Sequence, residues 1–80
     1  MEPFLGQIQI FPYGFAPRGW STCEGQVLSI AQNNALFALI GNKFGGDGRT
    51  TFALPDLRKA FPDKNASYYI ALEGVFPSRS

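Results

Sequence analysis

The sequence contains no histidine and a single cysteine, Cys23, among its 80 residues. A lone cysteine cannot form a disulfide within its own chain, and histidine is both a common zinc ligand and the commonest general base at neutral pH. Cys23 therefore has no imidazole to activate it, which excludes a cysteine–histidine catalytic pair. We expect neither a metal nor any other cofactor, and we do not expect an enzyme.

Charge of either sign is also scarce. Seven Lys and Arg residues oppose six Asp and Glu residues, for a net charge of +1, and the signs are interspersed. Proteins that bind nucleic acids concentrate positive charge, so we expect no nucleic-acid partner. No apolar run approaches the 18 or more residues of a membrane span, and the Met1-Glu2-Pro3 start is unlike a signal peptide. These features predict a protein made in the cytoplasm without membrane insertion.

Aromatic and turn-forming residues are plentiful instead. The chain has eight Phe, three Tyr and one Trp, together with nine Gly and six Pro. A chain this short buries only about 60 to 65% of the surface that it exposes when unfolded, so small domains usually need a disulfide, a metal or oligomerisation as well. Because the composition removes the first two within one chain, it favours association between copies.

Short strands are predicted along the chain. Residues 7–10 alternate Gln and Ile, which is typical of a half-buried strand with Ile8 and Ile10 facing the core. Further strands are expected at residues 20–23, 26–28, 50–54 and 68–72. The first two of these would form a small hairpin around a turn at Glu24-Gly25. We therefore expect an α+β fold, a small single domain of mostly antiparallel strands linked by glycine- and proline-rich loops.

One short helix is predicted at about residues 29–40. Ser29 and Gln32 have the spacing of a capping box, and Gly41 supplies the stop. The apolar face of the helix comprises Leu36, Leu39 and Ile40. A helix of this length is not stable alone, so it must dock on a sheet or on a partner.

The glycine-rich run Gly45-Gly46-Asp47-Gly48-Arg49 is a candidate anion site. Neighbouring backbone N–H groups and Arg49 could form a nest for an anion, but no Lys-Ser/Thr pair and no helix follow, as a phosphate-binding loop requires. A structural turn is the favoured interpretation. The carboxylates are scattered through loops without a paired pattern, which favours turn and cap roles over acid–base catalysis.

The aromatic residues leave two interpretations open. Their faces stack well on sugars and on partner surfaces, and five of them could form such a platform: Tyr13, Phe15, Trp20, Tyr68 and Tyr69. Packing in the core of so small a domain is the favoured alternative. Cys23 is expected to be a small buried apolar residue or a free thiol rather than a cross-link between subunits.

Four segments resemble the phage tail collar domain in their residue strings. They are residues 15–20 (FAPRGW), 23–30 (CEGQVLSI), 34–41 (NALFALIG) and 45–58 (GGDGRTTFALPDLR). The resemblance runs from about Phe4 to Arg58 without an obvious gap. The family also includes bacterial proteins called microcystin-dependent, and residues 70–79 resemble the C-terminal ending of their longer members.

The chain differs from those longer relatives after Arg58. A glycine-, Ser/Thr- and His-containing region precedes the terminal strand in them, whereas only residues 59–67 fill that space here. In related short tail fibres the His-bearing region is associated with metal-stabilised, receptor-binding trimers, so those functions are not carried over. The resemblance implies a collar-like domain at residues 1–58, a connector at 59–67, and a strand at 68–80 that completes the same domain or a neighbouring subunit.

The resemblance implies a structural role in a virion tail or a tail-like particle. We expect a homo-oligomer, with a trimer favoured over another ring or a filament, and other tail proteins as further partners. The residues expected to mediate association are Tyr13, Trp20, Tyr68, Tyr69, Ile70, Leu72 and Phe76. The alternative function is a glycan- or receptor-binding module of a tail fibre that stacks sugars on Tyr13, Trp20 and Tyr69.

Overall fold

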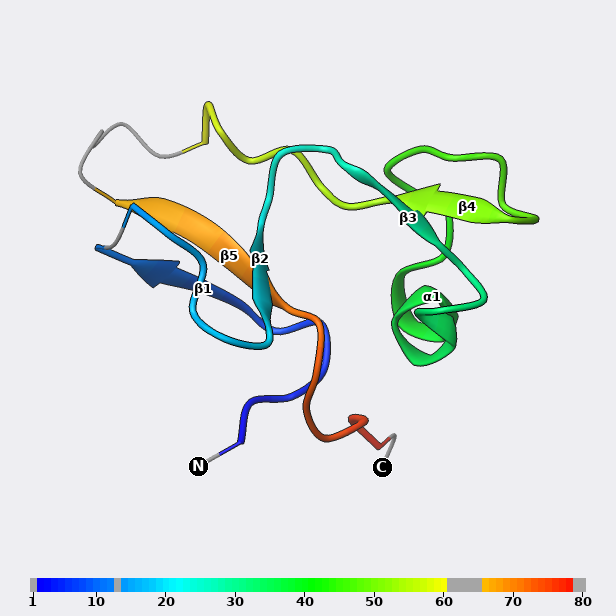
Figure 1. Cartoon of the computed structure of the whole chain (residues 1–80), viewed down its shortest axis with the longest axis horizontal. Helices are drawn as coiled ribbons and strands as arrows, with labels where there is room; N and C mark the ends of the chain where they lie inside the picture. The colour runs from blue at the N-terminus through cyan, green and yellow to red at the C-terminus, as the bar shows by residue number, and fades with distance from the viewer. Residues whose placement is uncertain (1, 13, 61–65, 79–80) are drawn as a thin grey trace.

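The computed structural model describes residues 2–12, 14–60 and 66–78. Its elements in chain order are β1 (Ile8–Phe11), β2 (Trp20–Thr22), β3 (Val27–Ser29), α1 (Asn34–Ile40), β4 (Thr51–Ala53) and β5 (Ser67–Ala71). Figure 1 shows β1, β2 and β5 grouped on one side of the molecule, and β3, β4 and α1 on the other. This arrangement confirms the predicted small α+β fold.

The strand β5 lies at the centre of a three-stranded sheet, in the order β1-β5-β2. Both neighbours run antiparallel to it, with Ile70 opposite Ile8 of β1 and opposite Ser21 of β2. The strand predicted at residues 68–72 is therefore present, displaced by one residue. Because β1 and β2 are not adjacent, each depends on β5 for its sheet hydrogen bonds.

The predicted hairpin between residues 20–23 and 26–28 is wrong. The strand β2 pairs with β5, while β3 pairs with β4 in a separate two-stranded sheet. The chain does not reverse at Gly25, because residues on either side of it pair with the segment that follows β4. In that pairing the Gly25 N–H donates to the Pro55 carbonyl at 3.3 Å, and the Leu57 N–H donates to the Cys23 carbonyl at 2.8 Å. Pairing with residues 55–57 thus replaces the predicted turn at Glu24-Gly25.

The helix α1 begins at Asn34, five residues after its predicted start at residue 29. The predicted capping box is wrong, because Asn33 occupies the N-cap position and makes no side-chain capping bond. Ser29 instead belongs to β3, where it lies opposite Thr51. The Asn33 side-chain Nδ2 donates to the Ser29 carbonyl at 3.0 Å, which ties the turn before the helix to that strand. Ser29, which local spacing assigned to the helix, therefore belongs to the two-stranded sheet.

The end of α1 and its docking agree with the sequence. The Gly41 N–H donates to the Phe37 carbonyl at 2.7 Å, so the helix stops at the predicted glycine. The rings of Phe37 and Phe52 meet with their centroids 5.4 Å apart. Seven residues are too few for an independent helix, and α1 is held by packing against β4 and the core.

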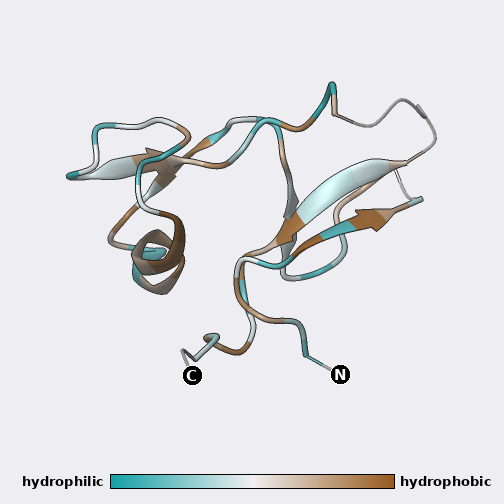
Figure 2. Ribbon diagram, turned by 180° about the vertical axis from the view of Figure 1, so that it is seen from behind, coloured by the Kyte–Doolittle hydropathy of each residue, from teal (hydrophilic) through white to brown (hydrophobic). Residues whose placement is uncertain are grey.

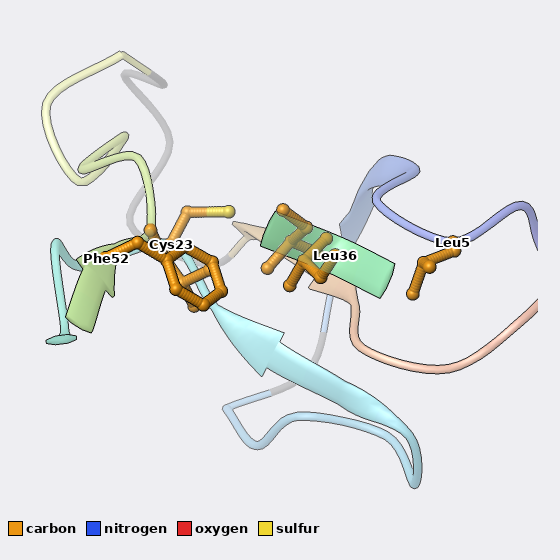
Figure 3. Close-up of a cluster of buried hydrophobic side chains, with 6 residues drawn as sticks. Leu5, Cys23, Leu36 and Phe52 are labelled. Atoms are coloured by element: carbon orange, nitrogen blue, oxygen red, sulfur yellow. The ribbon is translucent and has the colours of Figure 1, made fainter. Parts of the chain in front are cut away.

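The core lies between α1 and the strands of both sheets. Its buried cluster consists of Leu5, Cys23, Leu36, Phe52, Leu54 and Ile70. In Figure 3, Leu36 of α1 lies between the Cys23–Phe52 pair and Leu5. The cluster therefore joins residues from nearly the whole length of the chain.

Ile8 and Ile10 lie at the margin of this core. They share a sheet face with the buried Ile70 and with Tyr68, as the register of β1 and β5 requires. However, they remain 42% and 39% exposed. The strand β1 is at the edge of its sheet, and Figure 2 shows its hydrophobic and hydrophilic residues alternating. The side chains of Ile8 and Ile10 therefore point to the core side of the sheet, as predicted, but the core does not bury them.

Gly46 is a position where a side chain would be poorly tolerated. Its φ is +87°, and an added methyl group would overlap the backbone of Phe52 in β4. We expect Gly46→Ala to lower the free energy of unfolding by about 3 kcal/mol or more, because left-handed strain adds to a clash with a strand. A urea denaturation curve, monitored by circular dichroism, measures this loss of stability.

Gly41→Ala is the matched control for Gly46→Ala. Gly41 also has a positive φ, of +59°, but no atom lies within 4 Å of an added methyl group. It should lose only the strain contribution, about 1 to 3 kcal/mol, and therefore less than Gly46→Ala. Equal losses in the two variants would contradict the clash with β4.

Candidate functional site

The residues predicted to mediate association are divided between the interior and the surface. Four of them belong to β5 or follow it directly: Tyr68, Tyr69, Ile70 and Leu72. Tyr69 and Ile70 are each 1% exposed, whereas the other two are half-buried. Phe76 is exposed, Trp20 is half-buried, and Tyr13 lies outside the described residues. The two buried residues thus serve the chain's own sheet as it is folded here.

Trp20 belongs to an aromatic cluster on the sheet face opposite the core. Successive residues of a strand point to opposite faces, so Tyr69 faces away from the cluster that contains Ile70. The rings of Phe11 and Trp20 meet edge to face at a centroid distance of 5.1 Å, and Phe11 lies 5.7 Å from Tyr69. Because β1 and β2 flank β5, the two outer rings meet across the sheet and leave Tyr69 covered.

This aromatic cluster changes the sugar-stacking interpretation. Edge-to-face aromatic pairs contribute about 0.5 to 1.5 kcal/mol beyond the area that they bury. Tyr69 is therefore part of a second small core, and its ring is not open to a sugar in this fold. Of the other predicted stacking residues, Trp20 and Tyr68 are half-buried, Phe15 is 69% exposed, and Tyr13 lies outside the described residues.

Two grooves border Trp20. One, of about 370 Å³, is lined by Glu2, Pro3, Gln7, Gln9, Phe11 and Trp20. The other, of about 250 Å³, is lined by Glu2, Pro3, Arg18, Gly19, Trp20, Glu73 and Gly74. Amide, carboxylate and guanidinium groups thus converge around an indole, a combination that suits a polar ligand with an apolar face.

The amides in the larger groove are ordered by hydrogen bonds. The Phe4 N–H donates to Gln7 Oε1 at 3.0 Å, and Gln7 Nε2 donates to Gln9 Oε1 at 3.4 Å. This relay fixes the orientation of Gln7 and aligns Gln9 along the exposed side of β1. From the sequence, Gln7 and Gln9 were predicted only as the polar residues of an alternating strand.

Backbone pairing brings together exposed apolar residues from the two ends of the described chain. Phe4 and Val75 are partners in a parallel bridge, and the Leu5 N–H donates to the Val75 carbonyl at 2.8 Å. We call Phe4, Val75 and Phe76 the terminal patch, and all three are exposed. Sequence reasoning named Phe76 but missed Phe4 and Val75, because a local pattern does not show that these two segments pair.

The nest formed by the glycine-rich run is filled by a carboxylate of the same chain. Asp47 Oδ1 accepts the N–H groups of Thr51, Arg49 and Thr50 at 2.9, 2.7 and 2.8 Å, and Oδ2 accepts the Thr50 hydroxyl at 2.8 Å. These backbone bonds, followed by the hydroxyl bond, hold the pKa of Asp47 well below its usual range. The geometry supports the structural turn rather than an external anion.

The Pro55-Asp56-Leu57-Arg58 segment combines a surface ion pair with a buried attachment. Arg58 donates from Nε and Nη2 to the two carboxylate oxygens of Asp56, at 3.0 and 2.7 Å, and these bonds lower the pKa of Asp56 to about 2. An exposed pair adds little stability. Leu57, between them, binds the backbone of Cys23.

Cys23 is a buried apolar residue in this structure, as the sequence suggested. Burial raises the pKa of its thiol to about 11, so the thiol stays protonated and unreactive at neutral pH. Within residues 2–12, 14–60 and 66–78, no group of three His, Cys, Asp or Glu residues is placed to hold a metal ion. The helix in these ranges is also too short and not apolar enough to span a membrane.

The described residues form a small α+β domain in which Asp47 and Gln26 are bonded within a turn and at a sheet edge. A family model described as the Phage Tail Collar Domain matches residues 6–62. The chain belongs to this family, whose role in phage tails is structural. No curated protein and no solved structure matches the chain. The matched segment ends before β5, so the central strand of the sheet lies outside it.

The Asp47 bonds predict how stability depends on pH. Because folding lowers the pKa of Asp47 from an ordinary value of about 3.9, its stabilising effect is complete above that value and is lost as the pH falls further. We expect the melting temperature of Asp47→Asn to lie below that of the wild type at pH 6. The difference should shrink between pH 4 and pH 2.

Glu2→Gln is the control for this titration, because it removes the same charge from an exposed residue outside the loop. Differential scanning calorimetry over the pH series follows all three proteins. A difference between wild type and Asp47→Asn that stays constant from pH 6 to pH 2 would show that the carboxylate charge is not what holds the loop.

Proposed function

We propose that this chain is a self-associating structural component of a phage tail fibre or collar. Family membership supports the tail setting. The observation that carries self-association is the amount of apolar surface: in the described residues eight large hydrophobic side chains are exposed, against nine buried hydrophobic residues in the core. Monomeric proteins seldom expose apolar surface in continuous patches, and such patches mark interaction sites.

The proposed assembly is a homo-oligomer, with a trimer as the favoured state and another ring or a filament as alternatives. Contacts between unlike surfaces of identical copies close into rings or continue as filaments, depending on the rotation between copies. The small size of the domain supports this proposal, because a main buried cluster of six residues is a limited source of stability. Other tail proteins are proposed as further partners, with synthesis in the cytoplasm before incorporation into the tail.

The terminal patch is the proposed contact surface. Its three residues are exposed and come from two segments that are held together by backbone hydrogen bonds. The backbone of the patch is therefore fixed before any partner arrives, which lowers the entropy cost of binding.

Exchange of β5 between subunits is a second proposed route to association. The strand forms all the sheet contacts of β1 and β2, so a copy donated by a neighbour would restore the same ladder. The connector that precedes β5 includes residues 61–65, which lie outside the described residues.

Removing the terminal patch tests the proposed contact. We expect the wild type to exceed the chain mass of 8.8 kDa between 1 and 100 μM, in size-exclusion chromatography with light scattering. The double variant Phe4→Ser, Phe76→Ser should have a lower mass than the wild type while keeping its circular dichroism spectrum, because both side chains are exposed.

The control for the patch variant is Val27→Ser with Phe44→Ser, which removes two exposed apolar side chains elsewhere. It should keep the mass of the wild type. A wild type that is monomeric at 100 μM would refute self-association, and equal losses in both double variants would refute a contact confined to the terminal patch.

Glycan binding is the second candidate function, and the grooves around Trp20 favour it. An indole edged by Arg18 and Glu73 offers both an apolar face and hydrogen-bonding groups to a sugar. Trp20 itself packs on Phe11, so the sharper variants are Arg18→Ala and Glu73→Gln, at exposed positions.

A glycan array measures this second candidate. We expect a bound glycan to be lost from both groove variants and retained by Lys43→Ala, an exposed control outside the groove. No binding by the wild type across a broad array at high protein concentration would argue against the groove as a sugar site.

A further inference from the structure

Among the described residues, no further strand pairs with the outer edge of β1. The Ala71 N–H donates to the Gln7 carbonyl at 2.9 Å, so Gln7 directs its carbonyl toward β5. Backbone groups alternate sides along an antiparallel strand, and Ile8 and Ile10 therefore direct their N–H and C=O groups away from β5. None of the backbone hydrogen bonds outside the strand ladders of the described residues involves either isoleucine.

The opposite edge of the same sheet, along β2, is closed by a side chain. Gln26 Nε2 donates to the Thr22 carbonyl at 2.9 Å and to the hydroxyls of Ser21 and Thr22 at 3.0 and 3.1 Å. Its Oε1 accepts the Glu24 N–H at 3.0 Å, which holds the amide in place. The sheet can therefore be extended at β1 but not at β2 without breaking these bonds.

The four-residue β1 edge carries neither charge nor proline, the two side-chain protections against pairing. Natural edge strands are guarded by charged side chains, proline or a bulge. The strand β1 reads Ile-Gln-Ile-Phe, without charge or proline, and its register with β5 is continuous. Its two isoleucines are also among the exposed large hydrophobic residues. Such an edge is a template for a further strand.

We propose that β1 pairs with β1 of a second copy of this chain, antiparallel, about a two-fold axis at Gln9. In this register Ile8 lies opposite Ile10 of the second copy, and Gln9 lies opposite Gln9. Every outward N–H and C=O of the two isoleucines then has a partner, and apolar side chains meet apolar ones on the same face. The near-palindromic order Ile-Gln-Ile favours a second copy over an unrelated strand.

Neighbouring registers are less favourable for identifiable reasons. A shift of two residues in one direction brings Pro12, which has no N–H, opposite Ile8. The opposite shift brings Gly6 opposite Ile10, but the Gly6 N–H already donates to the Ala71 carbonyl at 2.9 Å. Only the Gln9-centred register satisfies the whole edge.

This inference rests on the proposed self-association and names one contact within it. A two-fold contact is isologous and closes with two copies, so it is separate from the unlike surfaces that a trimer or filament would use. The pairing joins the two sheets edge to edge and covers the isoleucines that each copy leaves exposed.

Opposite charges at Gln9 test the register. Gln9 is exposed, so the chain should fold with Lys or Glu in its place. Each variant alone would set like charges against each other across the axis, where side chains of a non-hydrogen-bonded pair lie closest. In analytical ultracentrifugation at low salt, we expect Gln9→Lys and Gln9→Glu each to weaken dimerisation about tenfold or more. An equimolar mixture should form a mixed dimer of about wild-type affinity.

The control variants are Gln32→Lys and Gln32→Glu. Gln32 is an exposed residue that precedes α1. They should dimerise like the wild type and show no preference when mixed. Unchanged dimerisation of the Gln9 variants, or weakening without recovery in the mixture, would overturn the β1 pairing while the wild type still associates. A wild type that is monomeric at every concentration would instead overturn the proposed self-association itself.

Discussion

The antiparallel ladder that β5 forms with β1 and β2 is the interaction on which the rest of the structure depends. These two strands do not pair with each other, so their positions are set by a third strand. From that strand Ile70 enters the main core, whereas Tyr69 is covered by the aromatic cluster on the opposite face. One short segment thus links the sheet, the core beneath it and the aromatic cluster above it.

Features with a local physical cause could be predicted from the sequence. Gly41 ends the helix because it tolerates a positive φ, and the alternation of apolar residues located β1 and β5 to within one residue. Two of the segments that resemble the family also bond to each other in the fold. In particular, Leu57 attaches to the backbone of Cys23, which explains why the Pro-Asp-Leu-Arg segment is more than a surface turn.

Features that depend on distant partners could not be predicted. The turn signal at Gly25 was real, but the segment after β4 competes for the same backbone, so no hairpin forms. Ser29 fits a capping box, yet pairing with Thr51 in the sheet takes precedence. The candidate surfaces follow the same rule, because Phe4 meets Val75 only after the fold has formed. Asp47 shows the reverse, since its loop is local and was interpreted correctly as a turn.

The position of β5 in the chain also governs the order in which the domain can fold. It follows every other described element, and its partner β1 precedes all of them. Contacts between such distant segments form slowly, because a long loop must close before any ladder bond is made. During synthesis, β1 and β2 therefore leave the ribosome without their partner strand. For that interval both edges of β1 are open, and other chains made nearby compete with β5 for the strand.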